Sequence, residues 1–83
     1  MRLRDENLVR REIDGETVLL DLATSTYFSS NTTGTFLLRL LAEDREREFL
    51  VAELAREFGL DAQEAAADAD AFVAELVEQG LLV

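Results

Sequence analysis

The chain has 83 residues and carries 18 aspartates and glutamates against 8 arginines, which gives a formal net charge of −10. It contains no cysteine and no histidine. Disulfides, thiolate nucleophiles, imidazole bases and the usual zinc ligand sets are therefore excluded. From this composition we predict that the protein is not an enzyme, that it binds no metal and that it uses no cofactor.

Length and hydropathy limit the class of protein further. A chain of this size forms one domain, here residues 1–83, near the lower size limit for independent stability. No apolar run reaches the roughly 18 residues that a membrane span requires, and the first residues do not resemble a signal peptide. We therefore expect a cytoplasmic protein with no membrane partner.

The negative charge is concentrated in the second half of the chain. Residues 1–42 hold six acidic residues and five arginines, whereas residues 43–83 hold twelve and three, so the net charges are −1 and −9. Such a field repels nucleic acid and can steer a cationic partner towards the protein. The alternative interpretation is that the charge serves solubility alone.

Two strands and a tight turn are predicted near the N-terminus. The segments LVRREI (8–13) and ETVLLDL (16–22) flank Asp14-Gly15, a dipeptide that supplies the two positive φ angles of a type I′ turn. In the second strand Val18, Leu20 and Leu22 share one fully apolar face, and Leu19 and Asp21 share a mixed face. The pattern predicts an antiparallel hairpin.

A third, short strand follows. Residues 23–25 can turn the chain into Thr26-Tyr27-Phe28-Ser29, an aromatic pair among hydroxyl residues. The sequence thus predicts a three-stranded antiparallel meander.

Three helices are predicted after the strands. Asn31, Thr32 or Thr33 can cap a first helix that runs to about Ala42. A second helix ends at Gly59, a good C′ residue, and residues 43–48 before it are a mixed-charge linker or a helix start. Asp61 and Glu64 form a capping box for a third helix that reaches Gly80. Its apolar stripe is Ala65, Ala66, Ala69, Phe72, Val73, Leu76 and Val77.

The predicted fold class is α+β, with the order βββααα and a likeness to winged helix-turn-helix domains. In those domains the third helix enters the major groove of DNA and basic residues contact phosphates. Residues 60–83 of this chain contain six acidic residues and no arginine or lysine. We therefore expect no nucleic-acid partner.

Two long stretches of the sequence resemble a known family. REIDGETVLLDLATSTYFSSNTTGTFLLRLL and ELAREFGLDAQEAAADADAFVAELVEQGLL together resemble the PqqD-like family, the peptide-recognition elements of ribosomal peptide biosynthesis. The matching features are the LLDL strand, the aromatic strand that ends in Asn, the Thr-Gly at the start of the first helix, and the DADAFVAELVEQGLL spacing. One departure is Ser30, where the family usually has an aliphatic residue.

The resemblance implies a binding module for the leader segment of a precursor peptide. Freestanding small members serve lasso-peptide maturation or pyrroloquinoline quinone assembly, and we favour the lasso pathway. The implied role is to bind a leader with a Tyr, a Pro and a Leu as apolar anchors, and to present it to a separate leader peptidase and then a cyclase.

The third strand and third helix are the predicted peptide site. A disordered leader is held at low cost when it adds a strand to an exposed sheet edge, and the third strand of a meander has such an edge. Phe28 is the better core candidate of the aromatic pair, which leaves Tyr27 pointing outward or into the groove. Phe72 and Leu76 are core residues first, and Asp68 and Glu75 either meet basic leader residues or are solvated. The candidate contacts are Leu22, Thr26, Tyr27, Phe28, Ser29, Ser30, Asp68, Ala69, Ala71, Phe72, Glu75 and Leu76.

A second hypothesis is a structural winged-helix protein that dimerises through the same open edge, because an unpaired strand edge is a natural site for self-pairing. Titration with a synthetic leader separates the two hypotheses. Saturable one-to-one binding supports the first, and a mass that depends on dilution supports the second.

Overall fold

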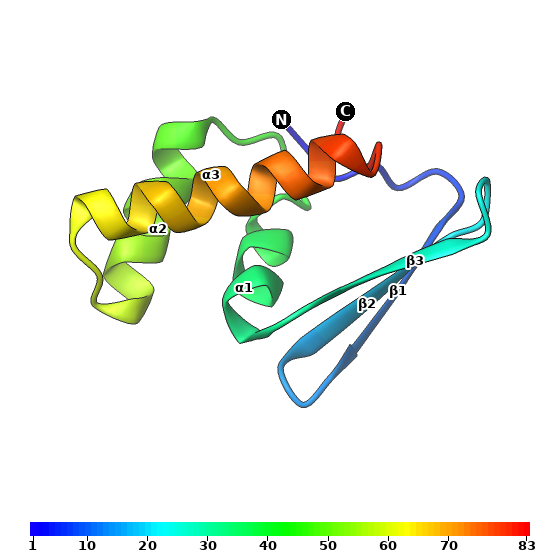
Figure 1. The fold of residues 1–83 in the computed structure, drawn as a ribbon, viewed down its shortest axis with the longest axis horizontal. Coiled ribbons are helices and arrows are strands. Elements are labelled where there is room, and N and C mark those ends of the chain that lie inside the picture. Colours follow the sequence, from blue (N-terminus) through cyan, green and yellow to red (C-terminus); the bar gives the residue numbers. More distant parts are fainter.

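The computed structural model describes all residues of the chain, 1–83, and confirms the α+β class and the βββααα order. The three strands form one antiparallel sheet in the order β1-β2-β3, and the helices lie together on one side of it (Figure 1). No helix is long and apolar enough to cross a membrane. The elements are β1 (Leu8–Ile13), β2 (Glu16–Asp21), β3 (Thr26–Ser30), α1 (Thr32–Leu40), α2 (Arg47–Phe58) and α3 (Ala62–Glu78).

The β1–β2 hairpin turns at the predicted dipeptide. Asp14 and Gly15 have φ angles of 53° and 78°, the two positive values that a type I′ turn needs. At the other end of β2 the Ala23 N–H donates a hydrogen bond to Asp21 Oδ1 at 3.0 Å, which turns the chain towards β3. As a result β2 ends at Asp21, one residue earlier than predicted. At its other end β3 extends to Ser30, one residue further than predicted.

The mixed face of β2, rather than the fully apolar one, packs against the helices. Thr17, Leu19 and Asp21 are buried, whereas Val18 and Leu20 are 41% and 39% exposed. The buried polar groups have partners: Thr17 Oγ1 lies 2.7 Å from Thr35 Oγ1 in α1, and Asp21 pairs with Arg4. Because these polar groups are satisfied, the mixed face can be buried without a large desolvation penalty. The exposed apolar surface, called the outer face from here on, comprises Val9, Ile13, Val18, Leu20, Leu22 and Tyr27.

The helix ends follow the predicted caps. Asn31 Oδ1 accepts a hydrogen bond from the Gly34 N–H at 3.0 Å, and Asp61 Oδ1 accepts one from the Glu64 N–H at 2.8 Å. Gly59 ends α2 with φ 63°. These contacts satisfy backbone groups that each helix end would otherwise leave free.

Three expectations for the helices need correction. α1 ends at Leu40, before the predicted Ala42, and α3 ends at Glu78, before the predicted Gly80. The start of α2 at Arg47 lies within the segment that the sequence left open as a linker or a helix start, and needs no correction. Val77 is 62% exposed and does not belong to the buried stripe of α3. Its neighbour Leu76 is fully buried, and a step of one residue turns the side chain about 100° around the helix axis, towards solvent.

The two ends of the chain pair with each other, as their positions in Figure 1 indicate. The Arg2 N–H donates to the Val83 carbonyl at 3.0 Å, and the Val83 N–H donates to the Arg2 carbonyl at 2.8 Å. This pairing places Leu3 and Leu81 in the hydrophobic core beside leucines of all three helices. No pattern in residues 1–7 predicted this contact.

Candidate functional site

β3 is an edge strand, and its register shows which main-chain groups face away from the sheet. The Leu22 N–H donates to the Asn7 carbonyl at 2.9 Å, so in β2 the main-chain groups of even-numbered residues point towards β1. Odd-numbered residues of β2 therefore point towards β3, where their partners are Thr26, Phe28 and Ser30. It follows that the N–H and C=O groups of Tyr27 and Ser29 point to the free edge.

α3 runs beside β3 and, together with the start of α1, encloses a hollow of about 260 Å³. The α1 residues in its lining are Thr33, Gly34 and Leu37. A second, shallow cleft lies further along β3, near the C-terminal end of α3. We call these two hollows, together with the Phe28–Phe72 contact between them, the groove. Its lining residues are Asn31, Thr33, Gly34, Leu37, Asp68, Ala71, Phe72 and Glu75 at one end, and Leu19, Asp21, Thr26, Tyr27, Phe28, Gln79 and Leu81 at the other.

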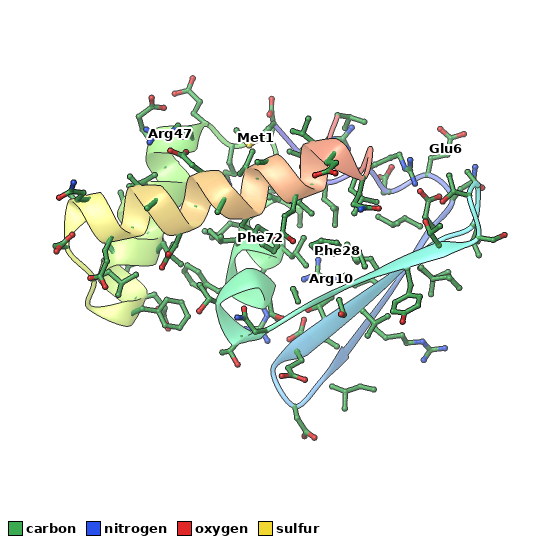
Figure 2. All side chains as sticks on the ribbon, in the orientation of Figure 1. Met1, Glu6, Arg10, Phe28, Arg47 and Phe72 are labelled. Carbon is green, nitrogen blue, oxygen red and sulfur yellow. The ribbon has the colours of Figure 1, made fainter.

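An aromatic pair lies between the two elements. Figure 2 shows Phe28 and Phe72 in the space between β3 and α3. Their ring centroids are 5.9 Å apart in an edge-to-face arrangement. Both rings are half-buried and pack on the core, so the pair forms an apolar floor that is still partly accessible.

Gly34 allows the start of α1 to approach this floor closely. A Cβ atom at position 34 would lie 2.7 Å from Phe72 Cε1 and 2.8 Å from Ser30 Cβ, distances that no substituted residue tolerates without movement. Ser30 Oγ is buried at this junction and has no hydrogen-bond partner. Gly34 at the start of α1 is thus required by packing at one end of the groove.

Three acidic residues in the middle of α3 divide into two sets. Asp70 faces α2, where Arg47 Nε and Nη2 donate to its two oxygens at 2.6 and 2.8 Å, and this hydrogen bonding lowers the pKa of Asp70. Asp68 and Glu75 line the hollow, are exposed and have no ion-pair partner. The groove therefore has two free carboxylates on its helical wall. No cluster of acidic residues has the arrangement of a metal site.

The structure brings most of the predicted site residues together. Thr26, Phe28, Asp68, Ala71, Phe72 and Glu75 line the groove, Ser29 presents its main chain at the free edge, and Ser30 lies at the junction with α1.

Four predicted residues lie elsewhere or contribute differently. Tyr27 borders the shallow cleft, but its side chain is paired with Leu20 on the outer face and is 74% exposed, so of the aromatic pair Phe28 is the residue that faces the groove. Leu22 follows β2 and is 53% exposed on the outer face. Ala69 and Leu76 are fully buried and support the helical wall from beneath.

Sequence reasoning missed the contribution of α1 and of the segment after α3. Asn31, Thr33, Gly34 and Gln79 line the groove. Asn31 and Thr33 were identified only as candidate helix caps, because nothing in a single sequence shows that the start of α1 meets α3.

The fold and this groove define a small domain with an open strand edge beside a long helix. Residues 16–82 match the family described as Coenzyme PQQ synthesis protein D (PqqD). The chain belongs to the PqqD family. No curated protein matches it.

Two solved structures are similar to the chain over almost its full length. One is described as TbiB1 in complex with the TbiA(beta) leader peptide; it shares 32% identity with a TM-score of 0.87, and the match covers 99% of this chain and 94% of that one. The other is described as lasso peptide synthetase B1 complexed with the leader peptide; it shares 26% identity with a TM-score of 0.81, and the match covers 96% and 93%.

Proposed function

We propose that this protein binds the leader segment of a ribosomally made precursor peptide in a lasso peptide pathway. The leader adds to the sheet as a strand at the free edge of β3, beside α3. The observation that carries the proposal is the groove, in which the outward main-chain groups of Tyr27 and Ser29 lie next to a half-buried aromatic floor. Main-chain hydrogen bonds provide affinity in this mode of binding, and pockets for side chains provide selectivity.

The two similar structures support the proposal, because both are complexes with a leader peptide. Their matches span nearly the whole of this chain, so the edge strand and α3 both fall within the shared fold. The chain offers no cysteine or histidine for catalysis. Its role in this proposal is therefore recognition, with the chemistry performed by separate enzymes.

Calorimetric titration with a synthetic leader from a neighbouring precursor gene tests the proposal. We expect saturable one-to-one binding with a Kd between roughly micromolar and nanomolar, the range for a short edge contact with a few apolar anchors. If the protein binds no leader and its mass, measured by sedimentation, falls on dilution, the result supports edge-to-edge dimerisation instead.

The family description favours one alternative pathway, the synthesis of coenzyme PQQ. The same groove would then hold a different precursor. Parallel titrations with a lasso leader and with a PQQ precursor peptide distinguish the two pathways, and preferential binding of the lasso leader by at least tenfold is the expected result.

The free carboxylates of α3 predict a salt-dependent association rate. Residues 43–83 carry a net charge of −9, so a leader with basic residues is attracted over a distance limited by the Debye length, about 8 Å at physiological ionic strength. The double change Asp68→Asn, Glu75→Gln should slow association at low salt and have little effect at high salt. Stopped-flow fluorescence with a dye-labelled leader measures both rates.

A matched control is the double change Glu48→Gln, Glu57→Gln on α2, which removes the same charge from exposed residues that have no ion-pair partner and do not line the groove. The control should retain most of the wild-type rate. If both double changes slow association equally, net charge alone steers the leader. Rates that stay flat from low to high salt would show that these carboxylates are only solvated.

We also propose a second step, in which the bound leader is presented to a leader peptidase and then to a cyclase. The outer face supports this step, because its aliphatic residues and Tyr27 form an exposed apolar surface. Surfaces of this kind mark sites of protein association. The outer face is continuous with the β3 edge, so an enzyme docked on it would also contact a leader strand added there.

We expect the change Leu20→Ser, on the outer face, to leave leader affinity within about twofold, because the residue points away from the groove. Cleavage of the leader by the peptidase should slow at least fivefold at limiting protein concentration. Val77→Ser, a change at an exposed apolar residue of α3 that lies neither on the outer face nor in the groove, is the control and should leave cleavage normal. Normal cleavage with Leu20→Ser would exclude the outer face as the docking surface.

A further inference from the structure

The two walls of the groove are joined mainly at its ends. No hydrogen bond or ion pair links β3 to α3, and the edge-to-face contact of Phe28 with Phe72 lies between them. At one end, β3 runs directly into α1, and Gly34 holds α1 against Phe72. The separation of the walls at the other end, near Thr26 and Gln79, must be set by a different contact.

Arg4 makes that contact. Its Nη2 atom lies 2.8 Å from Asp21 Oδ1, at the end of β2, directly across the sheet from Thr26. Its Nη1 atom donates to the Gly80 carbonyl at 3.0 Å, immediately after α3, and its main-chain N–H donates to the Leu81 carbonyl at 2.7 Å. One guanidinium thus bridges the sheet and the segment that follows α3.

The Arg4–Asp21 side of the bridge is sheltered from solvent. The Arg4 side chain is 24% exposed and that of Asp21 is 6% exposed. The Arg4 guanidinium holds the pKa of Asp21 below its ordinary value of 3.8, so the pair is charged throughout the neutral range. A sheltered ion pair holds a fixed geometry better than an exposed one, since side chains at the surface remain mobile and screened.

We propose that Arg4 is a positioning residue that sets the width of the groove at its Thr26–Gln79 end, and thereby the leader affinity, without touching the leader. The inference rests on the proposed function. Arg4 lines neither hollow of the groove, so an effect of its removal on binding has to pass through the positions of the two walls.

The width can be measured directly, because the chain has no native cysteine to interfere with labelling. Spin labels are attached at Leu22→Cys, beside Asp21, and at Glu78→Cys, at the end of α3. Pulsed electron paramagnetic resonance then measures the distance between the labels, which reports the separation of the walls. Arg4→Ala should broaden or lengthen the distance distribution, and added leader should narrow it again. Leader dissociation should be at least tenfold faster than in the wild type.

Arg2→Ala is the matched control. It removes the same charge from the same segment, but its ion pair with Asp5 spans 3.8 Å at the surface, away from the groove. It should leave the distance distribution and the dissociation rate unchanged. An Arg4→Ala protein that matches Arg2→Ala in both measurements would overturn the inference.

Two further variants keep the inference testable if Arg4→Ala does not fold. Asp21→Asn weakens the sheet side of the bridge while the Arg4–Gly80 hydrogen bond remains. Arg4→Lys retains the charge but lacks the planar guanidinium group that contacts both Asp21 and Gly80. Both should broaden the distance distribution, with Arg4→Lys closer to the wild type. If the wild type itself binds no leader, the proposed function fails, while the distance measurement still decides whether Arg4 holds the walls together.

Discussion

Proline at position 29 is expected to lower leader affinity by about 100-fold, equivalent to roughly 3 kcal/mol, because it removes an edge donor and prevents regular pairing on both sides of it. The N–H of Ser29 points to the free edge, so Ser29→Pro costs no hydrogen bond within the sheet. The domain should therefore remain folded by circular dichroism, and calorimetry with the synthetic leader measures the loss of affinity.

The other edge of the sheet provides a control for this substitution. The register gives Glu12 in β1 an outward N–H as well, on the edge remote from α3. Glu12→Pro should bind leader within about twofold of the wild type, although its ion pair with Arg39 is lost with the side chain. Equal losses in the two variants would indicate general damage to the sheet. Retained binding by a folded Ser29→Pro protein would mean that the leader does not pair with β3.

Truncation of Phe72 is expected to reduce both stability and binding. Phe72→Ala removes half of the aromatic floor and leaves a cavity beside Phe28, at a cost of about 2–3 kcal/mol in the free energy of unfolding. Loss of a pocket wall for an aromatic anchor should cost about 2 kcal/mol in binding, or roughly 30-fold in Kd. Urea denaturation and leader titration measure the two effects separately.

The neighbouring Val73 distinguishes a binding effect from a folding effect. Val73 is half-buried in α3 and packs on the core, but it does not line the groove. Val73→Ala should lower the free energy of unfolding by about 1 kcal/mol. Its leader affinity should stay within about twofold of that of the wild type. A leader whose Tyr and Leu are changed to Ala should bind the wild type weakly. If this altered leader binds as tightly as the native one, the groove does not recognise the side chains of the leader.

Stability and recognition are coupled at this site because the same residues serve both. Phe28 and Phe72 pack on the core and also form the accessible floor of the groove. Gly34 permits the close approach that brings α1 into the lining. Substitutions in the groove should therefore be compared with matched core changes, whereas those on the outer face and on α2 can be interpreted more directly.

The amino-acid sequence by itself determined the local structure of this protein. Asp14-Gly15 specifies the hairpin because few other dipeptides adopt two positive φ angles in succession. Asn31, Gly59 and Asp61 mark helix ends, since their side chains or conformational freedom satisfy the free backbone groups there. The acidic composition of α3 also argues against a DNA-reading helix, because its carboxylates repel the phosphates that such a helix must approach.

Only the tertiary structure decided which face of β2 is buried and where the groove lies. Alternation separates the two faces of a strand, but either can be buried when its polar groups find partners, and the partners of Thr17 and Asp21 are Thr35 and Arg4, distant in sequence. The groove lining from α1 and the Arg4 bridge also join segments that are distant in sequence, so sequence reasoning did not predict them. Contacts between distant segments depend on the packing of whole elements, which local periodicity does not encode.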